Sequence, residues 1–137
     1  MLTSESKERV RREHLELRGL LAELDSAAGG VLTSAPGAIT RLRAAVRALD
    51  TAFRAHLVME ESLLVPVLST QAVLRLRADH SEQRAAIAAL AGEIEADAKE
   101  PVLLADDVRW LVDGLLRDMG EEDRALEDLS RPIQEVT

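Results

Sequence analysis

The chain has 137 residues, of which 17 are basic and 25 acidic, giving a formal net charge of −8 with three histidines and no cysteine. This length predicts one domain, and the lack of cysteine excludes disulfides, thiolate zinc sites and iron–sulfur clusters and fits a cytoplasmic protein. Because the chain is acidic and its arginines are dispersed, we do not expect it to bind nucleic acid. We see no leader-like segment and no apolar run of 18 residues, so we expect neither secretion nor a membrane span.

Helical periodicity in four segments predicts an all-α protein. Apolar residues recur at alternating spacings of three and four, and clusters of glycine, proline, serine and threonine interrupt the pattern. We expect helices over residues 4–28, 36–68, 71–98 and 101–129. Short connections between long amphipathic helices favour antiparallel neighbours. The sequence therefore predicts an up-down-up-down four-helix bundle over residues 1–130, followed by a tail over residues 131–137.

The core stripe of each predicted helix is apolar except at one or two positions that carry polar side chains. The expected core positions are Val10, Leu17, Leu21, Leu24, Ala28, Leu42, Val46, Leu49, Phe53, Leu63, Val67, Val73, Leu76, Ile87, Leu90, Ile94, Leu104, Val108, Leu111, Leu115, Ala125 and Leu129. The ionisable residues that interrupt the stripes are, in chain order, His14, His56, Glu60, His80, Asp118 and Glu122.

A weak internal repeat supports this register. A shift of 62 residues places His56 and Glu60 on Asp118 and Glu122, and a shift of 66 places His14 on His80. Because alternate helices run in opposite directions and rise about 1.5 Å per residue, all six residues are expected about 15 Å from the same end of the bundle.

Six ionisable groups in one buried layer need a counter-charge. Burial of three carboxylates and three imidazoles without one would cost several kcal/mol per ion. Two divalent cations would supply it, and oxygen and nitrogen ligands without sulfur suit iron or manganese better than zinc. A metal-free network of histidines and carboxylates is the alternative.

The order of these residues resembles that of the hemerythrin-like (HHE) family over nearly the whole chain. The pattern H…HxxxE…H…HxxxE is matched by His14, His56, Glu60, His80 and Glu122, and the run from Glu60 to Pro66 is similar to the family's acidic pair followed by a proline. The resemblance implies a bundle that holds two irons joined by an oxo or hydroxo bridge. It implies that His14 and His56 bind one iron, that His80 binds the other, and that Glu60 and Glu122 bridge them.

Two positions depart from the family pattern. Asp118 stands where the family has its fourth-helix histidine, and Arg84 stands where the oxygen carriers have a second histidine on the third helix. Asp118 is expected either to bind the second iron as a hard anion or to leave that iron loosely held. Both changes remove an imidazole, which argues against reversible oxygen carriage.

The resemblance implies a cytoplasmic non-haem di-iron protein that binds or reacts with dioxygen (O2), peroxide or nitric oxide. Sensing, detoxification and weak peroxidase, catalase or oxidase activity are the expected roles, and neither an electron donor nor a protein partner is identified. The alternative is a storage, structural or protein-interaction bundle with an altered site for one metal. Glu61, Glu121 and Asp123 are expected on a solvated face, with Glu61 the best extra ligand, whereas Met59, Met119 and Trp110 are expected to pack.

Overall fold

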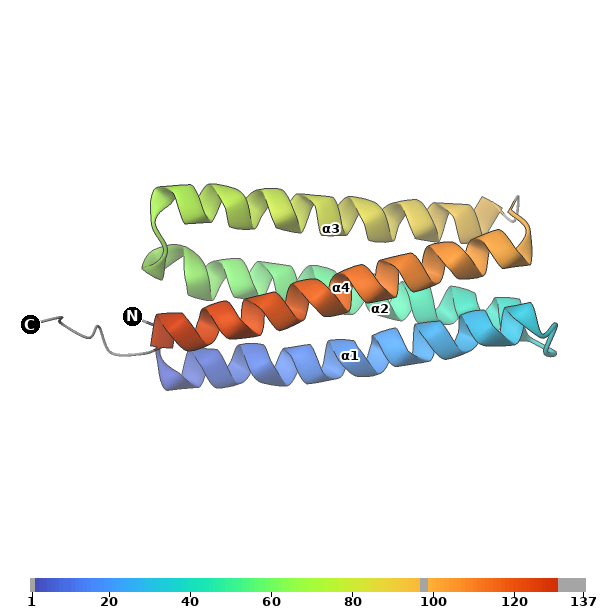
Figure 1. The fold of residues 1–137 in the computed structure, drawn as a ribbon, viewed down its shortest axis with the longest axis horizontal. Helices are drawn as coiled ribbons and strands as arrows, with labels where there is room; N and C mark the ends of the chain where they lie inside the picture. The colour runs from blue at the N-terminus through green and yellow to red at the C-terminus, as the bar shows by residue number, and fades with distance from the viewer. Residues whose placement is uncertain (1, 97–98, 131–137) are drawn as a thin grey trace, which may run out of the picture.

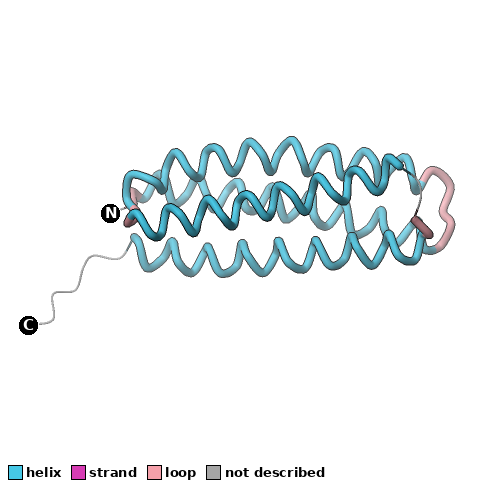
Figure 2. The backbone as a smooth tube through the Cα atoms, turned by 90° about the horizontal axis from the view of Figure 1, so that it is seen from above, coloured by secondary structure: helices cyan, strands magenta, loops and turns pink. Residues whose placement is uncertain are grey.

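The computed structural model describes residues 2–96 and 99–130. Its elements are α1 (Ser4–Leu32), α2 (Ala38–Leu64), the short 3₁₀ helix η1 (Val65–Val67), α3 (Thr70–Ala96) and α4 (Pro101–Ser130). The long helices alternate in direction, so that the start of α1 and the end of α4 lie at the same end (Figures 1 and 2). The predicted all-α, up-down-up-down bundle is confirmed. The predicted tail over residues 131–137, and residues 97 and 98 of the third predicted helix, lie outside the described residues.

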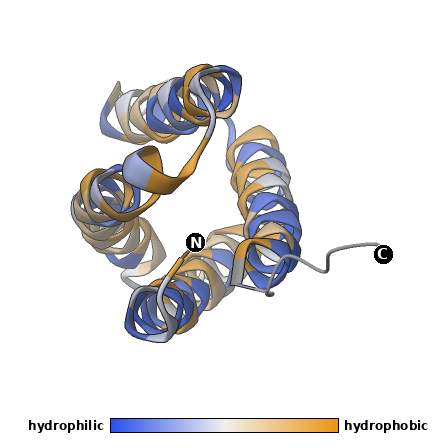
Figure 3. Cartoon of the chain, turned by 90° about the vertical axis from the view of Figure 1, so that its left-hand side faces the viewer, coloured by the Kyte–Doolittle hydropathy of each residue, from blue (hydrophilic) through white to orange (hydrophobic). Residues whose placement is uncertain are grey.

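Viewed along its length, the bundle has its helices arranged around a common axis, and each helix carries both hydrophilic and hydrophobic residues (Figure 3). This amphipathic pattern lets each helix bury one face and expose the other. In the part of the chain that the structure describes, no helix combines the length and the apolar character needed to cross a membrane.

The first helix continues through Gly29 and Gly30, where the sequence predicts a break. Burial of Val31 stabilises the additional turn, because its side chain is only 5% exposed. The turn forms further on instead, where Ser34 and Gly37 adopt positive φ angles of 55° and 72°. The second helix therefore begins at residue 38 rather than at residue 36.

The second helix also ends earlier than predicted, at Leu64 rather than at residue 68. Pro66 has no backbone N–H and cannot continue the i to i−4 hydrogen-bond ladder. The chain tightens into η1 at this proline, and the side-chain oxygen of Ser69 then accepts a hydrogen bond from the backbone N–H of Ala72 at the start of α3. Such N-terminal capping satisfies one of the free donors of a new helix.

The apolar core consists of two separate clusters of buried side chains. The larger contains 23 buried residues drawn from all four helices, including Leu21, Leu49 and Leu115. The smaller lies towards the end of the bundle that holds the start of α1, and its buried members are Leu2, Val10, Met59, Leu64 and Leu126. Most of the predicted core positions are buried, whereas Leu63, Val67, Val73, Leu76 and Leu129 are half-buried.

Two core predictions on α4 are wrong. Ala125 is exposed and Leu126 is buried in its place, so the buried stripe moves by one residue in the last turns of the helix. Trp110 does not pack, because its side chain is 80% exposed on the outside of the bundle. Met59 and Met119 are buried as predicted.

The core accounts for the stability of α1, and a matched pair of leucines on that helix tests this. We expect Leu21→Ala to lower the free energy of unfolding by about 2–5 kcal/mol, because the fully buried side chain leaves a cavity. Leu15→Ala is the control, since Leu15 is 66% exposed and its loss should change stability by less than about 0.5 kcal/mol. Urea unfolding of both variants measures the difference, and equal losses would contradict the assignment of the core.

Candidate metal centre

A layer of buried polar side chains separates the two apolar clusters. His14, His56, Glu60 and His80 are the polar or charged residues that are buried among those described. His14 and His80 lie ten residues after the starts of α1 and α3, and His56 lies eight residues before the end of α2. At about 1.5 Å per residue they share one level, about 12–15 Å from one end of the bundle.

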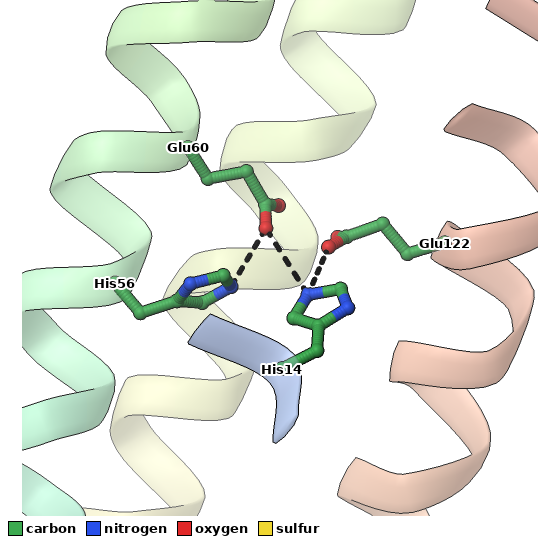
Figure 4. A group of neighbouring side chains, drawn as sticks. All are labelled: His14, His56, Glu60 and Glu122. Carbon is green, nitrogen blue, oxygen red and sulfur yellow. Dashed lines mark ion pairs between the residues drawn. The ribbon is translucent and has the colours of Figure 1, made fainter. Parts of the chain in front are cut away.

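Four side chains from three helices point towards one another within this layer (Figure 4). One ligand atom from each of His14, His56, Glu60 and Glu122 lies within 4.8 Å of the others. His14 Nε2 is 2.8 Å from Glu122 Oε1 and 3.6 Å from Glu60 Oε2. His56 Nε2 is 2.7 Å from the same Glu60 oxygen, because the i, i+4 spacing places the two residues on one face of α2.

The two oxygens of the Glu60 carboxylate face different histidines. Its Oε2 atom faces His14 and His56, whereas its Oε1 atom lies 3.0 Å from His80 Nε2. Glu60 is fully buried, so both of its oxygens depend on these imidazoles for polar contacts. A carboxylate in this position is able to join two groups of ligands.

The polar atoms of this cluster are not satisfied by the protein alone. His14 Nε2, Glu60 Oε2 and Glu122 Oε1 are buried and, within the described residues, have no hydrogen-bond partner of suitable geometry. Buried polar groups in native proteins are almost always satisfied. A cation between the three atoms would satisfy them together, and the mixed nitrogen and oxygen donors suit a divalent transition metal.

Each histidine directs its other ring nitrogen to a carboxylate on a different helix. His14 Nδ1 donates to Asp123 at 2.6 Å, His56 Nδ1 lies 3.3 Å from Glu13 Oε1, and His80 Nδ1 lies 3.2 Å from Glu61 Oε1. An ionised carboxylate only accepts hydrogen bonds, so the Nδ1 atom that faces it carries a proton. In the neutral imidazole this leaves the lone pair on Nε2, which is the atom that faces the cluster.

Two arginines of α1 hold the outer carboxylates in place. Arg18 donates to Asp123 Oδ2 at 2.7 Å, and Arg9 lies 3.5 Å from Glu13 Oε2. The connection therefore runs from a guanidinium through a carboxylate to an imidazole. Outer contacts of this kind fix the orientation and the basicity of ligating histidines.

The acidic and basic groups shift one another's pKa values in the metal-free protein. Burial lowers the pKa of His14, but the facing carboxylates of Glu122, Glu60 and Asp123 outweigh it and raise the pKa to about 10. Burial raises the pKa of Glu122 to about 8, with the negative Glu60 adding to the effect and His14 opposing it. Burial also acts to raise the pKa of Glu60, but the three imidazoles prevail and hold it well below its ordinary value.

The structure brings together five of the six predicted site residues and leaves Asp118 apart. Asp118 Oδ2 accepts a hydrogen bond of 3.1 Å from Gln83 Nε2, across the contact between α3 and α4. His80 reaches Glu60, although it lies outside the group of four converging atoms.

Sequence reasoning did not predict that the outer carboxylates contact the histidines, although Glu61 was considered as an extra ligand. Asp123 and Glu61 were expected on a solvated face, and Glu13 was given no role, yet each contacts the Nδ1 atom of a histidine. Each directly adjoins a residue of the polar layer in the sequence, which is the signal that could have identified them. Glu121, the remaining candidate, is exposed as expected.

The comparisons with known proteins give one match. The model of the hemerythrin HHE cation-binding domain matches residues 6–129 of the chain. No curated protein and no solved structure matches it.

The pKa shifts predict how the stability of the metal-free protein depends on pH. His14 and Glu122 hold protons in the folded state that the unfolded chain releases at lower pH, because both pKa values lie above the ordinary ones. The free energy of unfolding should therefore fall as the pH rises from about 5 to about 9. Urea unfolding with a chelator present measures this fall, and Glu122→Gln should make it shallower. A stability that increases over this range would contradict the assigned protonation.

The outer carboxylates should matter for cation affinity. We expect Asp123→Asn to weaken Mn²⁺ or Fe²⁺ binding by about 10- to 100-fold, because the neutral amide polarises His14 less and loses the ion pair with Arg18. Glu121→Gln, which removes an exposed charge two residues earlier, is the control. Competition with a chelating dye measures both affinities. Equal affinities of the two variants would show that Asp123 does not support the site.

Proposed function

Because the chain belongs to the hemerythrin HHE cation-binding domain family, we propose that it binds iron at the buried histidine and carboxylate layer and that the iron binds or reacts with O2, peroxide or nitric oxide. Sensing or detoxification of these molecules in the cytoplasm, with weak peroxidase, catalase or oxidase activity, is the proposed role. The family match supports cation binding, and the choice of iron and of the small molecule is our inference.

One observation carries the proposal. The buried atoms His14 Nε2, Glu60 Oε2 and Glu122 Oε1 converge without hydrogen-bond partners among the described residues. In the metal-free protein these atoms face one another as close ion pairs without hydrogen-bond geometry, so the cost of removing them from water is only partly offset. A cation bound by these atoms is the simplest way to offset that cost.

The residues of the buried layer would hold and orient the iron. His14, His56, Glu60 and Glu122 would bind it, with His80 on the far oxygen of Glu60. The outer carboxylates retain the Nδ1 protons, so the ligating nitrogens remain available. Bound iron would supply exchange between the ferrous and ferric states and a site at which a small molecule could react.

Other catalytic chemistry has little support in the chain. All three histidines lie in the polar layer, and the sequence contains no cysteine and no tyrosine. Acid–base catalysis by a free imidazole, a thiolate nucleophile and a tyrosyl radical are therefore excluded. Reactivity would have to come from the metal.

A second candidate function is metal storage, or a structural or protein-interaction role, with one metal bound. The contact between Asp118 and Gln83 favours it, because the carboxylate predicted to bind a second iron is engaged elsewhere. The four converging atoms provide ligands for one cation, whereas His80 is the only other histidine available for a second. Two irons per chain would support the first candidate, and one would support the second.

Anaerobic loading with Fe²⁺ followed by metal analysis and visible spectroscopy tests the proposal. We expect at least one iron per chain and a change in the visible spectrum on addition of O2, peroxide or nitric oxide. His56→Gln should reduce the bound iron strongly because it removes a ligand, whereas Glu82→Gln, at an exposed position of α3, should not. Circular dichroism in the presence of chelator checks that both variants fold.

Less than one iron per chain in the wild-type protein would contradict the proposed function.

A second variant, Asp118→His, separates the two candidates when the wild-type protein does bind iron. If Asp118 does not bind metal, the added imidazole should raise the number of irons from one to two. If the wild-type protein already holds two, the number should not change.

A further inference from the structure

The side of α4 that faces away from the bundle carries an exposed tryptophan. Trp110 is the only tryptophan in the chain, and its side chain is 80% exposed. α4 packs against α1 and α3, and its buried core stripe includes Leu104, Leu111 and Leu115. A large aromatic side chain opposite that stripe has no role in the fold, and exposed tryptophans of this kind are typical of protein interfaces.

The same side of α4 contains charged residues in an ordered arrangement. We call this surface the outer face of α4 and define it by Asp106, Trp110, Asp113, Arg117, Gly120 and Arg124, which share one side of a helix with 3.6 residues per turn. The four charged residues are exposed. Within the described ranges, none of them has an ion-pair partner. The two aspartates flank Trp110 along the helix, and the two arginines follow them.

This order of charges is complementary to itself when a second α4 runs in the opposite direction. Asp113 and Arg117 lie two residues on either side of position 115, and Asp106 and Arg124 lie nine residues on either side. Two antiparallel copies centred on residue 115 therefore place each aspartate opposite an arginine of the other copy. A parallel arrangement would place like charges together.

The position of Gly120 fits the same arrangement. Trp110 and Gly120 are each five residues from position 115, so the antiparallel pairing places each indole over a glycine of the other copy. A Cβ atom at Gly120 would meet nothing within 4 Å in the described part of the chain. No contact among those residues requires glycine there, although glycine costs about 1 kcal/mol relative to alanine in a helix. The missing side chain leaves space for an aromatic ring.

We propose that the outer face of α4 binds a second copy of this chain, with the two α4 helices antiparallel and Trp110 of each copy packed over Gly120 of the other. Such an interface is twofold symmetric, so one surface supplies both sides of the contact. The two Asp113–Arg117 pairs lie next to the twofold axis, and an indole is buried over a glycine on either side of them. The two Asp106–Arg124 pairs lie at the ends of the contact, so the four pairs together fix the register. The proposal does not depend on metal binding, because Glu122 points into the bundle.

Sedimentation velocity and the fluorescence of the single tryptophan test this association on the full-length protein. We expect a monomer–dimer equilibrium, with Trp110 emission at shorter wavelength and less quenching by acrylamide as the protein concentration rises. Trp110→Ala should raise the dissociation constant of the dimer by at least about tenfold. Leu74→Ala, which removes a 65% exposed side chain from α3, should leave it unchanged.

A protein that stays monomeric at every concentration would overturn the proposal, and so would a dimer that Trp110→Ala does not weaken. The second result would place the interface elsewhere on the chain.

A charge exchange tests the antiparallel register. Asp113→Arg and Arg117→Asp should each weaken the dimer, because each places like charges opposite one another. The double variant restores opposite charges across the twofold axis and should recover most of the affinity. Circular dichroism verifies folding, which is expected because both positions are exposed. Failure of the double variant to recover would overturn the antiparallel pairing.

Discussion

The cost of removing ionisable groups from water governs the central layer of this bundle. Three imidazoles and the carboxylate of Glu60 are buried between two clusters of apolar side chains, out of contact with bulk solvent. Each imidazole has two ring nitrogens that need polar partners. The protein satisfies one nitrogen of each ring with a carboxylate from another helix and directs the other nitrogen towards Glu60 or Glu122. Every helix supplies at least one member, so the layer connects all four helices at one level of the bundle.

Periodicity made most of the fold predictable. A buried stripe at spacings of three and four is dictated by helix geometry, and the stripe of α1 from Val10 to Ala28 is buried throughout. Predictions of helix ends from local sequence signals were wrong where tertiary packing outweighed those signals. Gly29 and Gly30 would weaken an isolated helix, but the burial of Val31 carries α1 past them. The predicted stripe of α4 already placed Trp110 on the opposite side of the helix from Leu111 and Leu115, and the expectation that it packs was wrong because it was drawn from the size of the side chain alone.

The inner part of the site was more predictable than the outer part. A polar residue that interrupts an apolar stripe can be recognised from the sequence. In contrast, Glu13, Glu61 and Asp123 resemble surface residues, and they contact the histidines only because of how the neighbouring helices are rotated. The orientation of Asp118 is equally hidden, because its stripe position is compatible with both the layer and Gln83. Sequence patterns therefore locate residues on helix faces, but the choice between competing hydrogen-bond partners depends on small differences in distance across helices.

The outer carboxylates also determine what an approaching molecule meets first. The side chains of Glu13, Glu61 and Asp123 are 24–28% exposed, whereas the imidazoles behind them are almost inaccessible. Arg9 pairs with Glu13 and Arg18 pairs with Asp123, which neutralises part of the charge of these carboxylates. These carboxylates thus shield the imidazoles from solvent as well as orienting them, so each of the three side chains serves both purposes.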